Sequence, residues 1–216
     1  MPVTELDVVC RSENRFSLLQ MSKQEWVRTM VGGEEFDLLN LESPQVEKRV
    51  MEEMANGVKV YYDRRWEVTA HLTDWLAANR ELVEGRRVLI LGVGVGAESL
   101  LLGKLAEQVW LNDLAPIALE LCARQMERNG LRNFTLLPGR YEKLDLPEVD
   151  LVVGSFLIYE TETRLAMEAY LAQSDSEVIL VNESLADFKK LLEERGGEVL
   201  FENEEGMQGV KLKGVN

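Results

Sequence analysis

The chain has 216 residues, 46% of them hydrophobic, and a formal net charge of −14 at pH 7. This length is typical of one domain with a sizeable core, and no run approaches the ~18 apolar residues that a membrane-spanning helix needs, so we expect no membrane partner. The excess of acid repels phosphate groups and disfavours a nucleic-acid partner, while two cysteines without metal-ligand or redox spacing predict no metal site and a cytoplasmic location.

The first 57 residues have a mixed pattern without a recognisable chemical motif. The S-x-x-E box that begins at Ser22 predicts a short helix, which runs to about Val31 and stops at the glycine pair that follows. Apolar residues at helical spacing predict a second helix from Pro44 until Gly57. The stretch VKVYY then reads as a short strand, and WEVTAHLTDWLAANRELV reads as a helix.

After Gly85 the pattern changes, because apolar runs of strand length alternate with helical stretches. The runs are RVLILG, QVWLND, FTLLPG, DLVVGSF and EVILVNE. This alternation predicts an α/β fold with a doubly wound, mostly parallel sheet that is covered by helices on both faces. The tail EVLFENEEGMQGVKLKG differs, since two strand-like runs joined by a short turn predict an antiparallel β-hairpin.

A glycine-rich turn follows the first of these runs, in the stretch VLILGVGVGAESL. Gly92, Gly94 and Gly96 would let the backbone approach a ligand closely at the carboxyl end of a strand, where open α/β sheets bind ligands. From Gly92 to Ala97 the turn is formally G-x-G-x-x-A, which suits the pyrophosphate of a dinucleotide. It is equally G-x-G-x-G, the methyltransferase form that wraps the methionine portion of S-adenosylmethionine, so both ligands stay open here.

An acidic residue, Asp113, ends the next apolar run. A carboxylate at this place can accept hydrogen bonds from both hydroxyls of a ribose, which both candidate ligands contain. NADP is less favoured because its 2′-phosphate would face an anion. The alternative role of Asp113 is to cap the helix that begins near Pro116, and the two roles can coexist.

The stretch NDLAPIALELCARQMERNGL and the C-terminal hairpin resemble the class I S-adenosylmethionine-dependent methyltransferases. The resemblance implies a seven-stranded sheet, S-adenosylmethionine as cofactor, and a set of cofactor-binding residues around the turn. That set is Gly92, Val93, Gly94, Gly96, Asn112, Asp113, Leu114, Arg140, Tyr141 and Ser155.

A narrower likeness is carried by DLVVGSFLIYE, which resembles the D-L-V-hydrophobic-G-x-D-x-x-Y-E strand of the seven-strand protein-lysine methyltransferases, the group that includes the electron transfer flavoprotein β-subunit lysine methyltransferase. Trp66 takes the tryptophan position of the segment that precedes the first strand in this group. The likeness covers roughly Val58 to Leu212. We therefore expect residues 58–216 to form the methyltransferase domain and residues 1–57 to form an N-terminal extension that acts as a lid.

The likeness implies in-line transfer of a methyl group to a nitrogen of a protein lysine or of a small molecule. Tyr159 is the candidate for aligning the nucleophile, although a core tyrosine would read the same way in sequence. Trp66, Tyr62 and Phe156 are the candidates for lining the substrate pocket, with ordinary packing as the alternative for Trp66 and Tyr62.

Two departures from the group concern the site itself. Ile90 stands where the group has an acid that holds the turn and the ammonium end of the cofactor, and Glu98 lies too far along the next helix to be an obvious replacement. Phe156 stands where the group has the aspartate of D-x-x-Y. Three hypotheses therefore stay open: an active methyltransferase, a methyltransferase fold that binds cofactor or a partner without turnover, and an NAD(P)-binding oxidoreductase.

Overall fold

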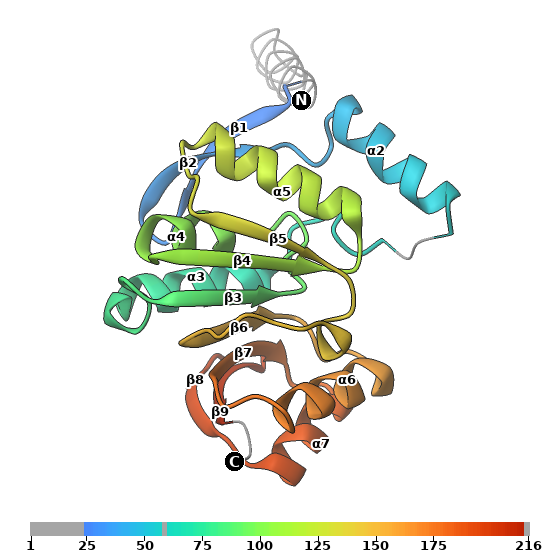
Figure 1. Ribbon diagram of the computed structural model, residues 1–216. Helices are drawn as coiled ribbons and strands as arrows, with labels where there is room; N and C mark the ends of the chain where they lie inside the picture. Colours follow the sequence, from blue (N-terminus) through green and yellow to red (C-terminus); the bar gives the residue numbers. More distant parts are fainter. Residues whose placement is uncertain (1–23, 58–59, 214–216) are drawn as a thin grey trace, which may run out of the picture.

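The computed structural model describes residues 24–57 and 60–213, and Figure 1 labels its elements. The strands are β1 (Trp26–Val31), β2 (Glu34–Leu39), β3 (Arg87–Leu91), β4 (Gln108–Asp113), β5 (Phe134–Pro138), β6 (Leu151–Ser155), β7 (Glu177–Glu183), β8 (Glu198–Glu202) and β9 (Met207–Lys213). The helices are α2 (Pro44–Ala55), α3 (Glu67–Ala78), α4 (Glu98–Leu105), α5 (Pro116–Arg128), α6 (Thr161–Leu171) and α7 (Ala186–Arg195), with short 3₁₀ turns η1 (Arg80–Leu82) and η2 (Tyr141–Lys143). No helix within the described residues has the length and apolar character needed to cross a membrane.

Seven strands form the central sheet in the order β5-β4-β3-β6-β7-β9-β8. The pairs from β5 to β7 are all parallel, and β9 runs antiparallel to both β7 and β8. The predicted α/β fold, with a mostly parallel sheet and a C-terminal antiparallel hairpin, is therefore confirmed. The hairpin places β9 inside the sheet and β8 at its edge, which differs from the 3-2-1-4-5-6 order of a dinucleotide-binding sheet.

Both faces of the sheet are covered, and β3 shows why its sequence is apolar throughout. Val88 and Ile90 face a core shared with α3, α4 and α5, whereas Leu89 and Leu91 face a second core shared with α6 and α7. All four side chains are 0% exposed. Such double burial removes the in-and-out alternation that a one-sided sheet would show, as expected for parallel strands.

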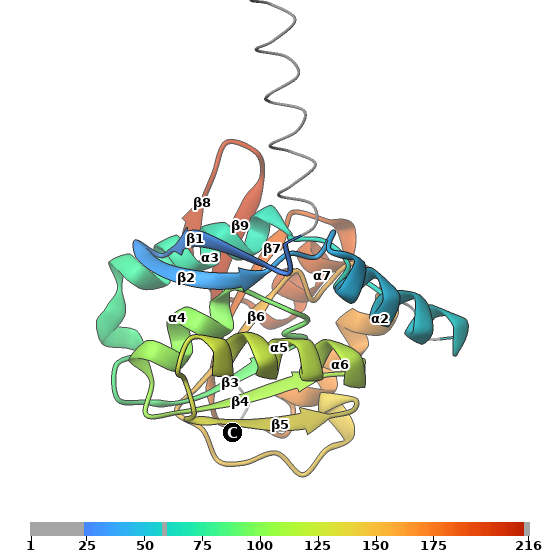
Figure 2. The ribbon, with the colours of Figure 1, turned by 90° about the horizontal axis from the view of Figure 1, so that it is seen from above.

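The described part of the N-terminal extension begins with a β-hairpin, so the helix predicted from the Ser22 box to about Val31 is wrong for residues 24–31, while its start lies outside the described part. β1 pairs antiparallel with β2, and the glycines between them, Gly32 and Gly33, have φ values of +54° and +78°. Two consecutive positive φ angles fit the tight turn that matches the twist of a two-stranded ribbon. Figure 2 shows this hairpin beside α3 and α4. The predicted strand VKVYY is also wrong for residues 60–62, which form no strand, while its first two residues lie outside the described part.

The hairpin is held in place by the side-chain amides of Gln125 on α5 and of Asn129 directly after it, which accept hydrogen bonds from the backbone of β2. The Leu39 amide donates to Oε1 of Gln125 at 3.0 Å, and the Asp37 amide donates to Oδ1 of Asn129 at 2.9 Å. Nε2 of Gln125 also donates to the Gly96 carbonyl at 3.4 Å. Gln125 therefore links the N-terminal hairpin to the glycine-rich turn.

We expect replacement of Gln125 by methionine to destabilise the fold. Gln125 and Leu39 are both 0% exposed, so Gln125→Met keeps the side-chain length and leaves the Leu39 amide buried without an acceptor. An unsatisfied buried donor costs about 1–3 kcal/mol of unfolding free energy, which urea unfolding followed by tryptophan fluorescence would measure. Gln173→Met is the matched control, because Gln173 is exposed and makes one long bond to the Glu142 carbonyl. Equal, small losses in both variants would show that the amide contact does not hold the hairpin.

Candidate functional site

A cavity of about 780 Å³ lies at the carboxyl ends of β3, β4 and β6. Its walls come from the glycine-rich turn, the segment before α3, the loop after β6 and the β1–β2 hairpin. Volumes of roughly 300–1,000 Å³ are typical of small-molecule sites. β3 lies between β4 and β6 in the sheet, and the order of the strands reverses at this point. The cavity therefore lies at the place where open α/β sheets bind ligands.

The glycine-rich turn forms part of the cavity wall. Gly92 and Gly94 have φ values of +59° and +54°, which side chains other than glycine rarely adopt. A Cβ atom at Gly94 would lie 3.2 Å from the Cβ of Tyr62, and one at Gly92 would collide with the Leu157 side chain. The Val93 amide donates to the Asn112 carbonyl at 2.9 Å, which joins the turn to the end of β4.

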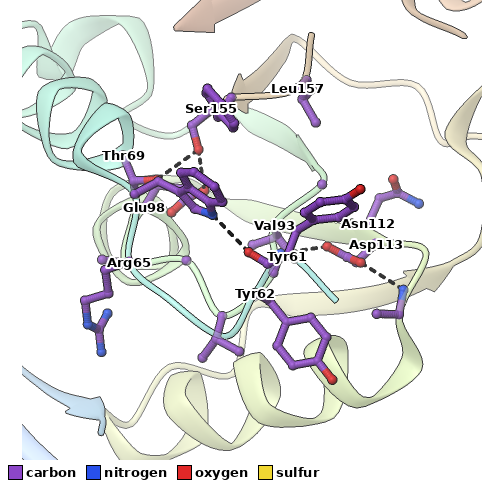
Figure 3. Close-up of a pocket in the computed structure, with 18 of the residues that line it drawn as sticks. Tyr61, Tyr62, Arg65, Thr69, Val93, Glu98, Asn112, Asp113, Ser155 and Leu157 are labelled. Atoms are coloured by element: carbon purple, nitrogen blue, oxygen red, sulfur yellow. Dashed lines mark hydrogen bonds between the residues drawn. The ribbon is translucent and has the colours of Figure 1, made fainter. Parts of the chain in front are cut away.

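Asp113 holds the turn and the following helix together while it lines the cavity. Its Oδ2 accepts from the Gly94 amide at 2.8 Å, and its Oδ1 accepts from the Ala115 amide, also at 2.8 Å (Figure 3). Burial raises the pKa of the Asp113 carboxyl, and these two amides act against the rise. The helix-start contact is therefore present, and the carboxylate also faces the cavity, where further lone pairs can accept donors from a ligand.

The residues on either side of Asp113, Asn112 and Leu114, have different roles. Nδ2 of Asn112 donates to the carbonyls of Leu137 and Gly139, at 2.8 and 2.9 Å, so this side chain secures the next loop. Leu114 lines the cavity and is 61% exposed, which leaves an apolar surface beside the carboxylate.

Arg140 and Tyr141 lie on the same wall of the cavity. Arg140 donates to Glu142 and to Glu162, the latter at 2.7 Å, and these carboxylates raise the pKa of its guanidinium. Its positive charge is therefore matched within the wall. Tyr141 packs edge-on against Tyr170, with ring centroids 6.0 Å apart.

A buried carboxylate, that of Glu98, lies on the other side of the turn, although its place in the sequence predicts that it is too far along the helix. Glu98 is 1% exposed and lines the cavity. Its Oε1 accepts from the Ser155 hydroxyl at 3.3 Å, and that hydroxyl lies 3.0 Å from the Thr69 hydroxyl (Figure 3). Ile90 is packed in the core, so no acid reaches the cavity from that position. The signal that could have identified Glu98 is an acid directly after the turn in an otherwise apolar stretch, AESLLLG.

Aromatic rings from the segment before α3 and from the loop after β6 cluster in the wall of the cavity. The rings of Trp66 and Phe156 stack with centroids 4.6 Å apart, Phe156 lies 6.1 Å from Tyr159, and Tyr61 lies 5.3 Å from Tyr159. Phe156 has a φ of +51°, a strained value for a bulky residue that costs roughly 1–3 kcal/mol. Burial raises the pKa of Tyr159 to about 12, so its hydroxyl is neutral at physiological pH.

Tyr62 differs from the other candidates for the substrate pocket. It is buried, and its hydroxyl donates to the Glu53 carboxylate on α2. Burial and Glu53 together raise the pKa of this hydroxyl. The backbone end of Tyr62 therefore lies at the cavity, beside Gly94. The hydroxyl end, through its bond to Glu53, connects α2 with the segment before α3.

No family model matches the chain. The chain is 30% identical over 102 residues to the histone-arginine methyltransferase METTL23 of Xenopus laevis, and the match covers 44% of this chain and 44% of that protein. A match to METTL23 of Rattus norvegicus is 28% identical and covers 52% of this chain and 55% of that protein. The chain spans about half the length of the curated relatives it matches.

Solved structures show the same architecture. The 16S rRNA N2 G1207 methyltransferase RsmC of T. thermophilus, in complex with AdoMet and guanosine, has a TM-score of 0.65 at 16% identity and covers 88% of this chain and 50% of that chain. The magnesium protoporphyrin IX methyltransferase ChlM of Synechocystis PCC 6803 with bound SAM has a TM-score of 0.58 at 18% identity and covers 80% and 92%. At these identities the likeness establishes the fold alone.

We expect the buried Glu98 to make stability depend on pH. Burial raises the pKa of its carboxyl from 4.5 to about 7 in the folded chain. The folded chain then keeps a proton that the unfolded chain has released, so the free energy of unfolding falls as pH rises from about 4.5 to 7. Glu98→Gln removes this penalty and should be more stable than the parent by up to about 3 kcal/mol at pH 8, with little gain at pH 4.5.

Urea unfolding at both pH values measures the effect, with Glu81→Gln as the control because Glu81 is exposed. A gain from Glu98→Gln that is the same at pH 4.5 and pH 8 would contradict the raised pKa.

Proposed function

We propose that this chain, which has the fold of the class I S-adenosylmethionine-dependent methyltransferases, binds S-adenosylmethionine and transfers its methyl group to a basic nitrogen of a protein side chain. One observation supports this most: the Asp113 carboxylate faces a cavity of about 780 Å³ while it holds the Gly94 amide of the glycine-rich turn. The ribose of an adenosyl ligand has two hydroxyls, from which such a carboxylate can accept hydrogen bonds.

The residues of this wall fit the parts of the cofactor. Asp113 would accept the ribose hydroxyls, and the exposed side chain of Leu114 would cover an apolar face of the adenine. The backbone of Gly92 and Gly94, which both line the cavity, would adjoin the methionine portion. The bound sulfonium supplies an already activated methyl group, so the chain needs to position the acceptor and exclude water.

The aromatic cluster indicates the chemistry of the acceptor. Clustered aromatic rings attract a guanidinium or an ammonium group, as the Arg64 guanidinium over the Trp66 ring at 5.3 Å illustrates. The acids Glu160 and Glu162 also line the cavity. An apolar slot lowers the pKa of an amine and so favours the neutral form that attacks. The neutral Tyr159 hydroxyl can accept a hydrogen bond from this nitrogen and align it.

Lysine fits the whole of this description, whereas arginine, whose guanidinium stays protonated, fits the aromatic cluster and the acids. The amphibian relative is named as a histone-arginine methyltransferase, whereas the sequence motif after β6 resembles lysine methyltransferases. The net charge of −14 attracts basic protein segments and repels nucleic acid, although one structural neighbour is an rRNA methyltransferase. A basic protein segment is therefore the preferred acceptor.

A second candidate is a protein that binds the cofactor or a partner without turnover. Phe156 favours it, because phenylalanine cannot accept the hydrogen bonds that an aspartate would accept at this position. An NAD(P)-binding oxidoreductase is disfavoured by the antiparallel strand β9 inside the sheet.

We expect S-adenosylhomocysteine to bind in calorimetric titration, and NADH and NADPH not to bind. Asp113→Asn should weaken the binding of S-adenosylhomocysteine by about 10- to 150-fold, the value of a lost charge-assisted hydrogen bond. Asp145→Asn is the control, because Asp145 is exposed and does not line the cavity. Binding of NADH with no binding of S-adenosylhomocysteine would overturn the proposed cofactor.

We expect radiolabelled methyl groups to be transferred from S-adenosylmethionine to histones or to basic proteins of a cell lysate, with the methylated residue identified after hydrolysis. Tyr159→Phe should lower the rate by about 10-fold or more, because the aligning hydroxyl is lost, while the affinity for S-adenosylhomocysteine stays the same. A parent protein that binds the cofactor yet labels nothing would favour the second candidate.

A further inference from the structure

Glu98, in the wall of the cavity, has a buried carboxylate oxygen without a hydrogen-bond partner. Within residues 24–57 and 60–213, three buried side-chain polar atoms lack a hydrogen bond, at Ser43, Arg49 and Glu98. Of these residues, Glu98 alone lines the cavity. An unsatisfied buried carboxylate oxygen is costly, and native structures retain such atoms where they have a role.

Burial raises the pKa of the Glu98 carboxyl, and the neighbouring Ser155 and Arg65 offset this rise only in part. Oε1 accepts from Ser155, whose hydroxyl is held by Thr69. The field of the Arg65 guanidinium lowers the pKa of Glu98, but Arg65 itself donates to the Leu39 carbonyl at 2.6 Å, and Figure 3 shows its guanidinium turned away from Glu98. The carboxylate is therefore prepared for a cation that the chain does not supply.

The position of Glu98 selects which part of a ligand it can meet. Glu98 and Asp113 lie on opposite sides of the glycine-rich turn, with Val93 between them (Figure 3). A Cβ atom at Gly96 would collide with the Glu98 carboxylate, so this carboxylate lies directly over the turn. A ligand whose ribose meets Asp113 would extend its other end along the turn toward Glu98.

We propose that Glu98 is the counter-ion of the α-ammonium group of the bound cofactor, in the role that Ile90 cannot fill. The inference rests on the proposed function, because the amino-acid end of an adenosyl sulfonium compound is the cation that it names. An ammonium donates three hydrogen bonds, of which one satisfies the free Oε2 of Glu98 and the charges compensate each other in the buried site. Ser155 and Thr69 fix the orientation of the carboxylate and are positioning residues.

Calorimetric titration at pH 8 with two ligands tests this assignment. S-adenosylhomocysteine has the amino-acid end, and 5′-methylthioadenosine has the same adenosine without it. We expect Glu98→Gln to weaken S-adenosylhomocysteine about 10- to 100-fold and to leave 5′-methylthioadenosine unchanged within about twofold. We expect Asp113→Asn to weaken both ligands, because both contain the ribose.

The variants separate the possible failures. Glu98→Gln is expected to stabilise the ligand-free protein at pH 8, so weaker binding by this variant cannot be attributed to unfolding, and a thermal melt of each variant checks this. Unchanged affinity of Glu98→Gln for S-adenosylhomocysteine would overturn the assignment, and so would an equal loss for both ligands. If the parent protein binds neither ligand, the proposed function itself fails.

Discussion

The hydrogen bonds of the Asp113 carboxylate to the amides of Gly94 and Ala115 are the constraint on which the site depends. They join the turn after β3 to the start of α5, so two neighbouring strand ends form one wall. The glycines make this contact achievable, since a positive φ at Gly94 presents its amide to the carboxylate. The same carboxylate borders the cavity, and thus one buried group both shapes the wall and offers lone pairs to a ligand.

The wall of the cavity contains two carboxylates beside the turn, those of Asp113 and Glu98, and a cluster of aromatic rings. Glu98 costs stability at neutral pH because its charged form is buried, whereas a cation at Oε2 would recover that cost on binding. Phe156 is strained as well, and strain of this kind is common where a side chain is held for binding. Both features lower the stability of the folded chain relative to an apolar core. Such a loss of stability is common where a site is selected to recognise a ligand.

The sequence was informative where local pattern and fold agree. Continuous apolar runs predicted the parallel strands, and the place of Asp113 at the end of β4 followed from its position in the run. The β1–β2 hairpin was missed because the S-x-x-E box pointed to a helix, while the pairing of β2 with Gln125 and Asn129 depends on residues far along the chain. The glycine pair at its turn was the overlooked local signal.

The sequence also does not predict how the side chains of the site are oriented. Counting along a helix predicts that Glu98 lies too far from the turn, but it is the first residue of α4 and its carboxylate lies back over Gly96. Arg140 pairs with Glu142 two residues along the chain and with Glu162 on α6, and the second pairing is a tertiary contact that the local sequence does not indicate. The most direct test is a crystal structure of the protein with S-adenosylhomocysteine. We expect the ribose hydroxyls within hydrogen-bond distance of Asp113 and the amino group beside Glu98; a ligand bound elsewhere, or a ribose facing away from Asp113, would contradict the assigned site.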